Sequence, residues 1–211
     1  MPKILPVAAL FLCVAMLGIG APGALADDKT PRVTAADHVL GKSDAPVTIV
    51  MYASLTCPHC AAFEQEKLPQ IRKEWIDTGK AKLVFRDFPL DGRALLASSI
   101  ARCAPADRYF AFLGSLFESQ SRWALAQDPV DALKRVVRLG GMDGAAVDKC
   151  RADTKLQEAI IAGAEQAKND YGVESTPTFF IVAANGASTK LVGDLPYADF
   201  SRALGDAMAK S

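Results

Sequence analysis

Hydrophobic and polar positions follow two different periods along the chain. The run from Val47 to Tyr52 is almost continuously β-branched, aromatic or aliphatic, which is typical of a strand covered on both faces of an α/β sheet. From Ala61 onward apolar residues recur at helical spacing, and Pro69 should kink that helix near Leu68. Ala81 to Phe88 predicts a second strand. This order predicts a βαβ unit with two parallel strands and a right-handed crossover.

The remaining pattern is helical and then returns to strand. From Arg93 to Lys168 the periodicity is helical throughout, and prolines with one Gly-Gly pair divide it into four or five expected helices. Thr178 to Val182 and Thr189 to Val192 predict an antiparallel hairpin, because Asn185-Gly186 between them is a turn signal. Tyr197 to Ala209 predicts a terminal helix.

The N-terminus predicts an export signal. Residues 1–26 contain one charged residue, Lys3, and an apolar run from Ile4 to Ile19, and they end in Ala24-Leu25-Ala26, the small-x-small form of a signal-peptidase site. We therefore expect a periplasmic protein cleaved after Ala26, and cleavage also removes Cys13. An uncleaved membrane anchor is the alternative, although the run is short of the ~20 residues that a span needs.

The segment between the signal and the first strand carries little pattern. Residues 27–37 are polar and predict a loose arm. His38 is expected at the surface without a role. Residues 39–46 predict a turn that leads into the first strand.

Composition and charge limit the classes of function. Of 211 residues half are hydrophobic and 23% are charged, as in one globular domain with a substantial core. The chain has 24 basic and 24 acidic residues, so loss of Lys3 leaves a net charge near −1. No basic stripe with interleaved aromatic residues occurs, and we expect no nucleic-acid partner.

Cys57-Pro58-His59-Cys60 lies at the corner between the first strand and the helix. Two thiols at this spacing can form a redox disulfide, with Cys57 at the exposed helix end and Cys60 one turn further in. The unpaired N–H groups and the macrodipole stabilise a thiolate on Cys57. Pro58 suits the first helical position, and His59 adds a donor or a positive charge. We therefore expect a lowered pKa for Cys57, a stabilised reduced pair and a strongly oxidising disulfide.

Five cysteines leave four once the signal is removed, and four cysteines allow three pairings. The most economical pairing is Cys57 with Cys60 and Cys103 with Cys150. The second bond would close a long loop and stabilise the fold by about 4 kcal/mol. Free buried thiols at 103 and 150 are the alternative. For the close pair the alternatives are a structural bridge or half a zinc site, but only His38, Cys103 and Cys150 remain as further ligands. We expect no metal and no cofactor.

Ser175-Thr176-Pro177-Thr178 opens the hairpin, where a proline belongs at the first residue or edge of a strand. Together with the Cys-Pro-His-Cys corner, the helical segment and the export signal, it resembles the DsbA family of thioredoxin-fold thiol-disulfide oxidoreductases over nearly all of the mature chain. The resemblance implies an α/β thioredoxin fold with a large all-helical insertion. Residues 27–211 would be one domain, with its thioredoxin part at 38–92 and 169–211 and the insertion at 93–168.

The resemblance also implies roles for single residues. Cys57 would be the nucleophile, Cys60 the resolving thiol, and Thr176 with a cis Pro177 the substrate clamp. The partners implied are reduced, unfolded substrate proteins and a DsbB-like membrane quinone reductase that restores the disulfide. Members often carry a buried acid in the strand before the motif, and Met51 stands in its place here. Water or Glu64 would then have to accept the proton of Cys60.

The sequence thus predicts an exported enzyme that introduces disulfide bonds into other proteins. A disulfide isomerase or reductase of the same fold is the alternative, because Thr176 also precedes the cis-proline in isomerase-like relatives. A non-catalytic protein that uses the thiols to carry a metal, or its apolar groove to hold unfolded chains, is the second alternative.

Overall fold

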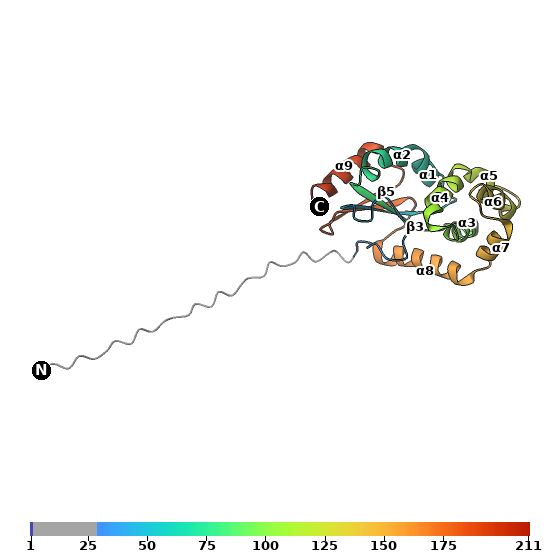
Figure 1. Cartoon of the computed structure of the whole chain (residues 1–211), viewed down its shortest axis with the longest axis horizontal. Coiled ribbons are helices and arrows are strands. Elements are labelled where there is room, and N and C mark those ends of the chain that lie inside the picture. The colour runs from blue at the N-terminus through green and yellow to red at the C-terminus, as the bar shows by residue number, and fades with distance from the viewer. Residues whose placement is uncertain (2–28) are drawn as a thin grey trace.

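The computed structural model describes Met1 and residues 29–211. A five-stranded mixed sheet forms the centre of the fold (Figure 1). In the order β1-β3-β2-β4-β5, the strands are β1 Val39–Leu40, β3 Ala81–Asp87, β2 Val47–Ala53, β4 Thr178–Val182 and β5 Ser188–Val192. β2 and β3 are parallel, whereas β4 is antiparallel to both β2 and β5. The predicted parallel pair and the hairpin are confirmed. The predicted signal, with Cys13 and the cleavage site after Ala26, lies outside the described residues.

The N-terminal part of the described chain differs from the prediction in two places. Val39–Leu40 is an edge strand antiparallel to β3 and not part of a turn, because pairing with β3 orders a run that is too short to show a period. The expectation of a loose arm is wrong for its described residues. The Arg86 guanidinium donates hydrogen bonds to the Asp37 carboxylate, and the hydroxyls of Thr30 and Ser188 are hydrogen-bonded at 2.8 Å.

The helix that follows β2 alternates between α-helical and π-helical turns. Its parts are α1 Pro58–Ala62, the π-helix η1 Phe63–Lys67, α2 Leu68–Ile71 and the π-helix η2 Arg72–Ile76. The N–H of Leu68 bonds to the carbonyl of Phe63, five residues back. Pro69 has no N–H to donate, and the helix widens one turn before it. The interruption predicted near Leu68 is therefore present as a π-type turn.

Six α-helices and one 3₁₀ turn lie between β3 and β4, where the pattern predicts four or five helices. They are α3 Gly92–Arg102, η3 Ala106–Arg108, α4 Tyr109–Glu118, α5 Gln120–Ala124, α6 Pro129–Arg138, α7 Gly144–Arg151 and α8 Thr154–Tyr171, and α9 Tyr197–Met208 ends the fold. α4 and α5 part at Ser119 without a proline or glycine to mark the break. The expected boundary at Lys168 falls inside α8, and the division into two parts stays a prediction.

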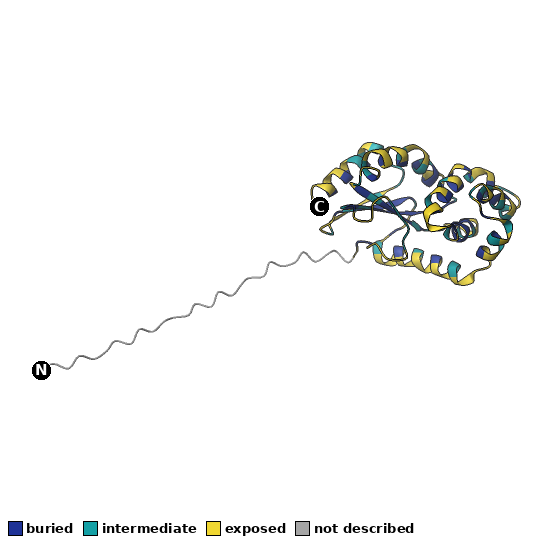
Figure 2. Ribbon diagram, viewed as in Figure 1, coloured by how far each residue is buried: buried dark blue, intermediate teal, exposed yellow. Residues whose placement is uncertain are grey.

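Helices cover both faces of the sheet, and alternate residues of β2 point into separate cores. Ile49 and Met51 pack in the larger cluster, which includes residues of α1, α4 and α9. Val50 and Tyr52 pack in the smaller one, with Ala167 of α8. The buried residues of the strands and the inward helix faces are dark blue in Figure 2. Within the described chain, no helix is both long and apolar enough to cross a membrane.

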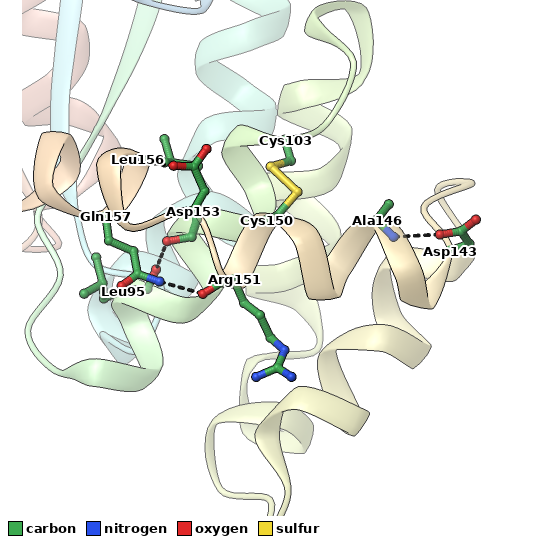
Figure 3. Close-up of a disulfide and its surroundings, with 10 residues drawn as sticks. Leu95, Cys103, Asp143, Ala146, Cys150, Arg151, Asp153, Leu156 and Gln157 are labelled. Atoms are coloured by element: carbon green, nitrogen blue, oxygen red, sulfur yellow. Dashed lines mark hydrogen bonds between the residues drawn. A yellow bond between two sulfur atoms is a disulfide. The ribbon is translucent and has the colours of Figure 1, made fainter.

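A disulfide joins Cys103, which follows α3, to Cys150 in α7 (Figure 3). The two Cα atoms are 6.2 Å apart, within the usual range for a disulfide. The helices around the bond are capped: the carboxylate of Asp143 accepts from the N–H of Ala146, and that of Asp153 accepts from the N–H of Leu156. The predicted Cys103–Cys150 bond is confirmed, and it links the end of α3 to α7, whereas Cys57 and Cys60 are free thiols in this structure.

We expect the double variant C103A/C150A to lose about 4 kcal/mol of unfolding free energy, because the bond removes the loop entropy of a long unfolded segment. Urea denaturation of the oxidised proteins at neutral pH measures this. The wild type with its disulfides reduced lacks the bond but keeps both sulfur atoms, and it therefore controls for the lost side-chain volume. An unchanged denaturation midpoint in the double variant would contradict the assigned role.

Candidate active site

The two close cysteines lie where β2 ends and α1 begins. Cys57 is the N-cap of α1, Pro58 occupies its first turn, and Cys60 lies one turn further along. Both are free thiols in the structure. Cys60 is completely buried and Cys57 is only 5% exposed, so the expectation that Cys57 lies at an exposed helix end is wrong. It is buried because the Thr176 loop lies over it: the Cys57 Sγ is 3.3 Å from the Thr176 carbonyl oxygen, to which the thiol donates.

The surroundings of Cys57 lower its pKa to about 5. The largest cause is the thiol of Cys60, which donates a hydrogen bond to the Cys57 sulfur, and burial acts against it. The Thr176 hydroxyl and the backbone N–H groups of Cys60 and His59 lower the pKa further. The lowered pKa predicted from the helix start is therefore found, with the neighbouring thiol as its main source.

Cys60 shows the opposite behaviour. Burial raises its pKa far above the ordinary value of a thiol, and both the hydrogen bond to Cys57 and the negative charge on Cys57 raise it further. One sulfur of the pair therefore carries the charge at neutral pH and the other carries the proton. This asymmetry defines which sulfur can act as a nucleophile or a leaving group.

The two residues between the cysteines are exposed. Pro58 supplies the fixed φ at the first helical position that the sequence predicts. His59 acts on the pKa of Cys57 through its backbone N–H. An electrostatic role for the His59 imidazole stays a prediction.

Thr176 and Pro177 reach the cysteines from the start of β4. The peptide bond between them is cis, as the resemblance implies. The Pro177 carbonyl accepts a hydrogen bond from the N–H of Gly193, which fixes this loop to the end of β5. The Thr176 hydroxyl is buried and makes no well-formed hydrogen bond within the described residues, so it acts on the Cys57 sulfur as a nearby dipole.

Two further residues, neither of them expected from the sequence, hold the loop before Cys57. The amide nitrogen of Gln120 donates to the carbonyl oxygens of Leu55 and Cys57 at 2.8 and 3.0 Å. The carboxylate of Asp91 accepts from the hydroxyl of Thr56 at 2.7 Å and also caps α3. Only the capping position of Asp91 before a helix leaves a signal in the sequence.

Met51 is fully buried in β2, at the position where the resemblance implies that family members often carry an acid. Glu64 lies one helical turn after Cys60, and burial raises its pKa to about 7, against the opposing effect of Arg72. Its carboxylate faces α4, since a Cβ built on Gly114 would lie 3.9 Å from Oε1. Glu64 can therefore exchange a proton near neutral pH.

The residues considered as metal ligands do not come together. Cys103 and Cys150 form the disulfide, and His38 stacks on Tyr109 with ring centroids 3.9 Å apart. His38 is thus half-buried rather than a free surface residue. Within residues 29–211, no group of three or more His, Cys, Asp or Glu side chains could hold a metal ion.

Comparisons with known proteins agree on the fold. The family model described as Thioredoxin matches residues 33–204. The crystal structure of alpha-DsbA1 from Wolbachia pipientis is 31% identical with a TM-score of 0.78, over 87% of this chain and 98% of that protein. A protein-disulfide isomerase from Novosphingobium aromaticivorans is 26% identical with a TM-score of 0.68, over 82% and 97%. A Rickettsia bellii protein, provisionally named protein-disulfide oxidoreductase, is 31% identical over 162 residues, and this chain spans 61% of its length.

Titration of the reduced protein should show one thiolate forming near pH 5, measured by absorbance at 240 nm. We expect the variant C60A to raise this pKa by about 1 to 2, because a hydrogen bond to a charged group is worth about 1.5–3 kcal/mol. The variant C57A should show no thiolate below pH 8. A C60A variant that titrates like the wild type would show that the Cys60 thiol is not the main donor.

Proposed function

This chain belongs to the DsbA-like family of thioredoxin-fold proteins, which confirms the predicted fold class. We propose that it oxidises thiols of other proteins through a Cys57–Cys60 disulfide. The observation that carries the proposal is the asymmetry of the pair. A thiolate on Cys57 with a pKa of about 5 stabilises the reduced form at neutral pH. Stabilising the reduced form makes the disulfide more oxidising than that of a pair without a stabilised thiolate.

The reaction consists of two thiol-disulfide exchanges. A substrate thiolate attacks the Cys57 sulfur of the oxidised pair, the bond between the two enzyme sulfurs breaks, and Cys60 leaves and takes up a proton. A second substrate thiolate then attacks the substrate sulfur of the mixed disulfide, and Cys57 leaves as a thiolate. Two electrons pass from the substrate to the enzyme, and the substrate gains one disulfide.

The Thr176-Pro177 loop is the proposed substrate clamp. Its support is its place against the Cys57 sulfur and the cis peptide bond. When Cys57 is bonded or ionised, it no longer donates to the Thr176 carbonyl, and that oxygen is then available to an extended substrate backbone.

Glu64 is the proposed partner of Cys60 in proton transfer: it donates a proton when the Cys60 sulfur leaves and accepts one when the disulfide forms again. Cys60 cannot leave as a stable thiolate, because burial raises its pKa. Glu64 lies one turn away on the same helix, with a pKa of about 7. No acid in β2 can take this role, since Met51 stands there.

The proposed partners follow from the same chemistry, and the proposed location follows from the expected export signal. The substrates are reduced, unfolded proteins outside the cytoplasm, and export would use the signal cleaved after Ala26. Disulfide donation reduces the enzyme, so an oxidant must restore the pair, and a DsbB-like membrane quinone reductase would do so. The similarity to alpha-DsbA1 supports reduced substrate proteins as the partners.

Disulfide isomerisation is the second candidate. It is favoured by Thr176 before the cis-proline and by the similarity to the Novosphingobium protein-disulfide isomerase. Refolding of scrambled ribonuclease by the reduced protein without added oxidant distinguishes the two, since rescue under these conditions favours isomerisation.

We expect a reduction potential about 50 mV above the ≈ −270 mV of thioredoxin, because the pKa of Cys57 is about 2 below the value of about 7 for the thioredoxin cysteine. Equilibration with glutathione measures it. C57S should abolish oxidation of a reduced peptide, whereas H59A should lower the potential if the imidazole stabilises the thiolate. A wild-type potential equal to that of thioredoxin would contradict the oxidase assignment.

The variant E64Q should slow the reduction of the enzyme disulfide by a substrate peptide, by roughly tenfold at neutral pH, since general acid catalysis contributes at least 10² when fully used. Single-turnover rates measured from pH 5 to 9 should lose the inflection near pH 7. The variant E66Q, on the same helix, is the matched control. Equal rates and pH profiles in E64Q and the wild type would contradict this role of Glu64 and indicate that water donates the proton to Cys60.

A further inference from the structure

The side chain of Gln120, the first residue of α5, connects the segment between β3 and β4 to the loop that carries the reactive cysteine. Its Nε2 donates to the carbonyl oxygen of Leu55 at 2.8 Å and to that of Cys57 at 3.0 Å. A primary amide nitrogen has two hydrogens, so one side chain can serve both carbonyls. Because both acceptors are carbonyl oxygens, only the nitrogen end of the amide can face the loop.

The two carbonyls flank the turn into α1. The Cys57 carbonyl also accepts from the N–H groups of Cys60 at 3.1 Å and Ala61 at 3.2 Å, the bonds that begin the helix. The Leu55 carbonyl lies two residues earlier in the chain. Rotation of either peptide group would move the Cys57 sulfur relative to the N–H groups of His59 and Cys60, which help to hold its charge.

Gln120 itself is held by the packing of its own short helix. Trp123, three residues later, is completely buried and donates from Nε1 to the Leu116 carbonyl at 2.8 Å. The hydroxyl of Ser119 donates to the Ser115 carbonyl at 2.6 Å, which closes the end of α4 against the start of α5. The amide of Gln120 therefore projects from a fixed base, as a residue that positions a reactive group requires.

We propose that Gln120 is a positioning residue of the thiol site, which fixes the Leu55–Cys57 loop so that the Cys57 sulfur lies against the backbone donors at the start of α1. This inference rests on the proposed exchange chemistry at Cys57. It extends the site to a residue 63 positions away in the sequence. In this arrangement the helices between β3 and β4 act directly on the geometry of the reactive thiol.

Gln65 offers a matched control in the same chain. Its Nε2 donates to the Phe117 carbonyl at 3.4 Å, across the contact between the helix that follows the motif and α4. It is the same side-chain type bonded to a backbone carbonyl of the same neighbouring segment. It makes no hydrogen bond to the loop before Cys57 in the described structure.

The experiment compares Q120M, Q120E and Q65M in the reduced full chain by thiolate titration at 240 nm and by equilibration with glutathione. Q120M keeps the size of the side chain and removes both donors, so the pKa of Cys57 should rise by about 1. The equilibrium with glutathione should shift toward the enzyme disulfide by roughly three- to tenfold. Q120E places an acceptor against two carbonyls and should raise the pKa further, whereas Q65M should change neither quantity.

An unchanged pKa and potential in Q120M, with only a loss of stability, would overturn the proposal, as would equal changes in Q65M. If Q120M does not fold, Q120N takes its place. The shorter amide can reach at most one of the two carbonyls, so the pKa of Cys57 should rise less in Q120N than is expected for Q120M. An unchanged pKa in Q120N would overturn the proposal. A wild-type protein that fails to oxidise peptides, with the pKa still raised in Q120M, would refute the proposed function and leave this role intact.

Discussion

The hydrogen bond from the Cys60 thiol to the Cys57 sulfur is the interaction on which the rest of the site depends. Both side chains are buried, so water contributes little to stabilising a charge there. The charge is held on Cys57 by donors of the protein, and the same contact keeps the proton on Cys60. A pair of this kind favours its reduced form, because the disulfide has neither the charge nor the hydrogen bond.

Four separate segments either bring polar groups to that sulfur or hold the loop that carries it. The start of α1 provides the N–H groups of His59 and Cys60, and the loop before β4 brings the Thr176 hydroxyl. Asp91 at the start of α3 and Gln120 at the start of α5 hold the loop between β2 and α1. The helices between β3 and β4 thus take part in the site as well as covering the sheet.

On the second face of the sheet the N-terminal arm is docked on β3, which the sequence pattern did not predict. Burial alone would raise the pKa of Asp37, but hydrogen bonds from Arg86 and Thr34 lower it, so the carboxylate is charged and docks the N-terminal arm on β3. Arg86 also donates to the Tyr52 hydroxyl on β2. Polar residues of an arm look alike in the sequence whether they are free or docked, because their partners lie far along the chain, 49 positions away for Asp37 and 158 for Thr30.

The sequence by itself determined the parallel β2–β3 pair, the hairpin and the Cys57-Pro58-His59-Cys60 corner, because periodicity, helix-start signals and close cysteine spacing act between neighbours in the chain. Cysteine counting also led to the Cys103–Cys150 bond. Only the tertiary structure decided that Cys57 is buried, that Cys60 is its main donor and that Gln120 reaches its loop. A glutamine that binds two carbonyls has the same local pattern as one at the surface, and only the packing of α5 against the active-site loop distinguishes them.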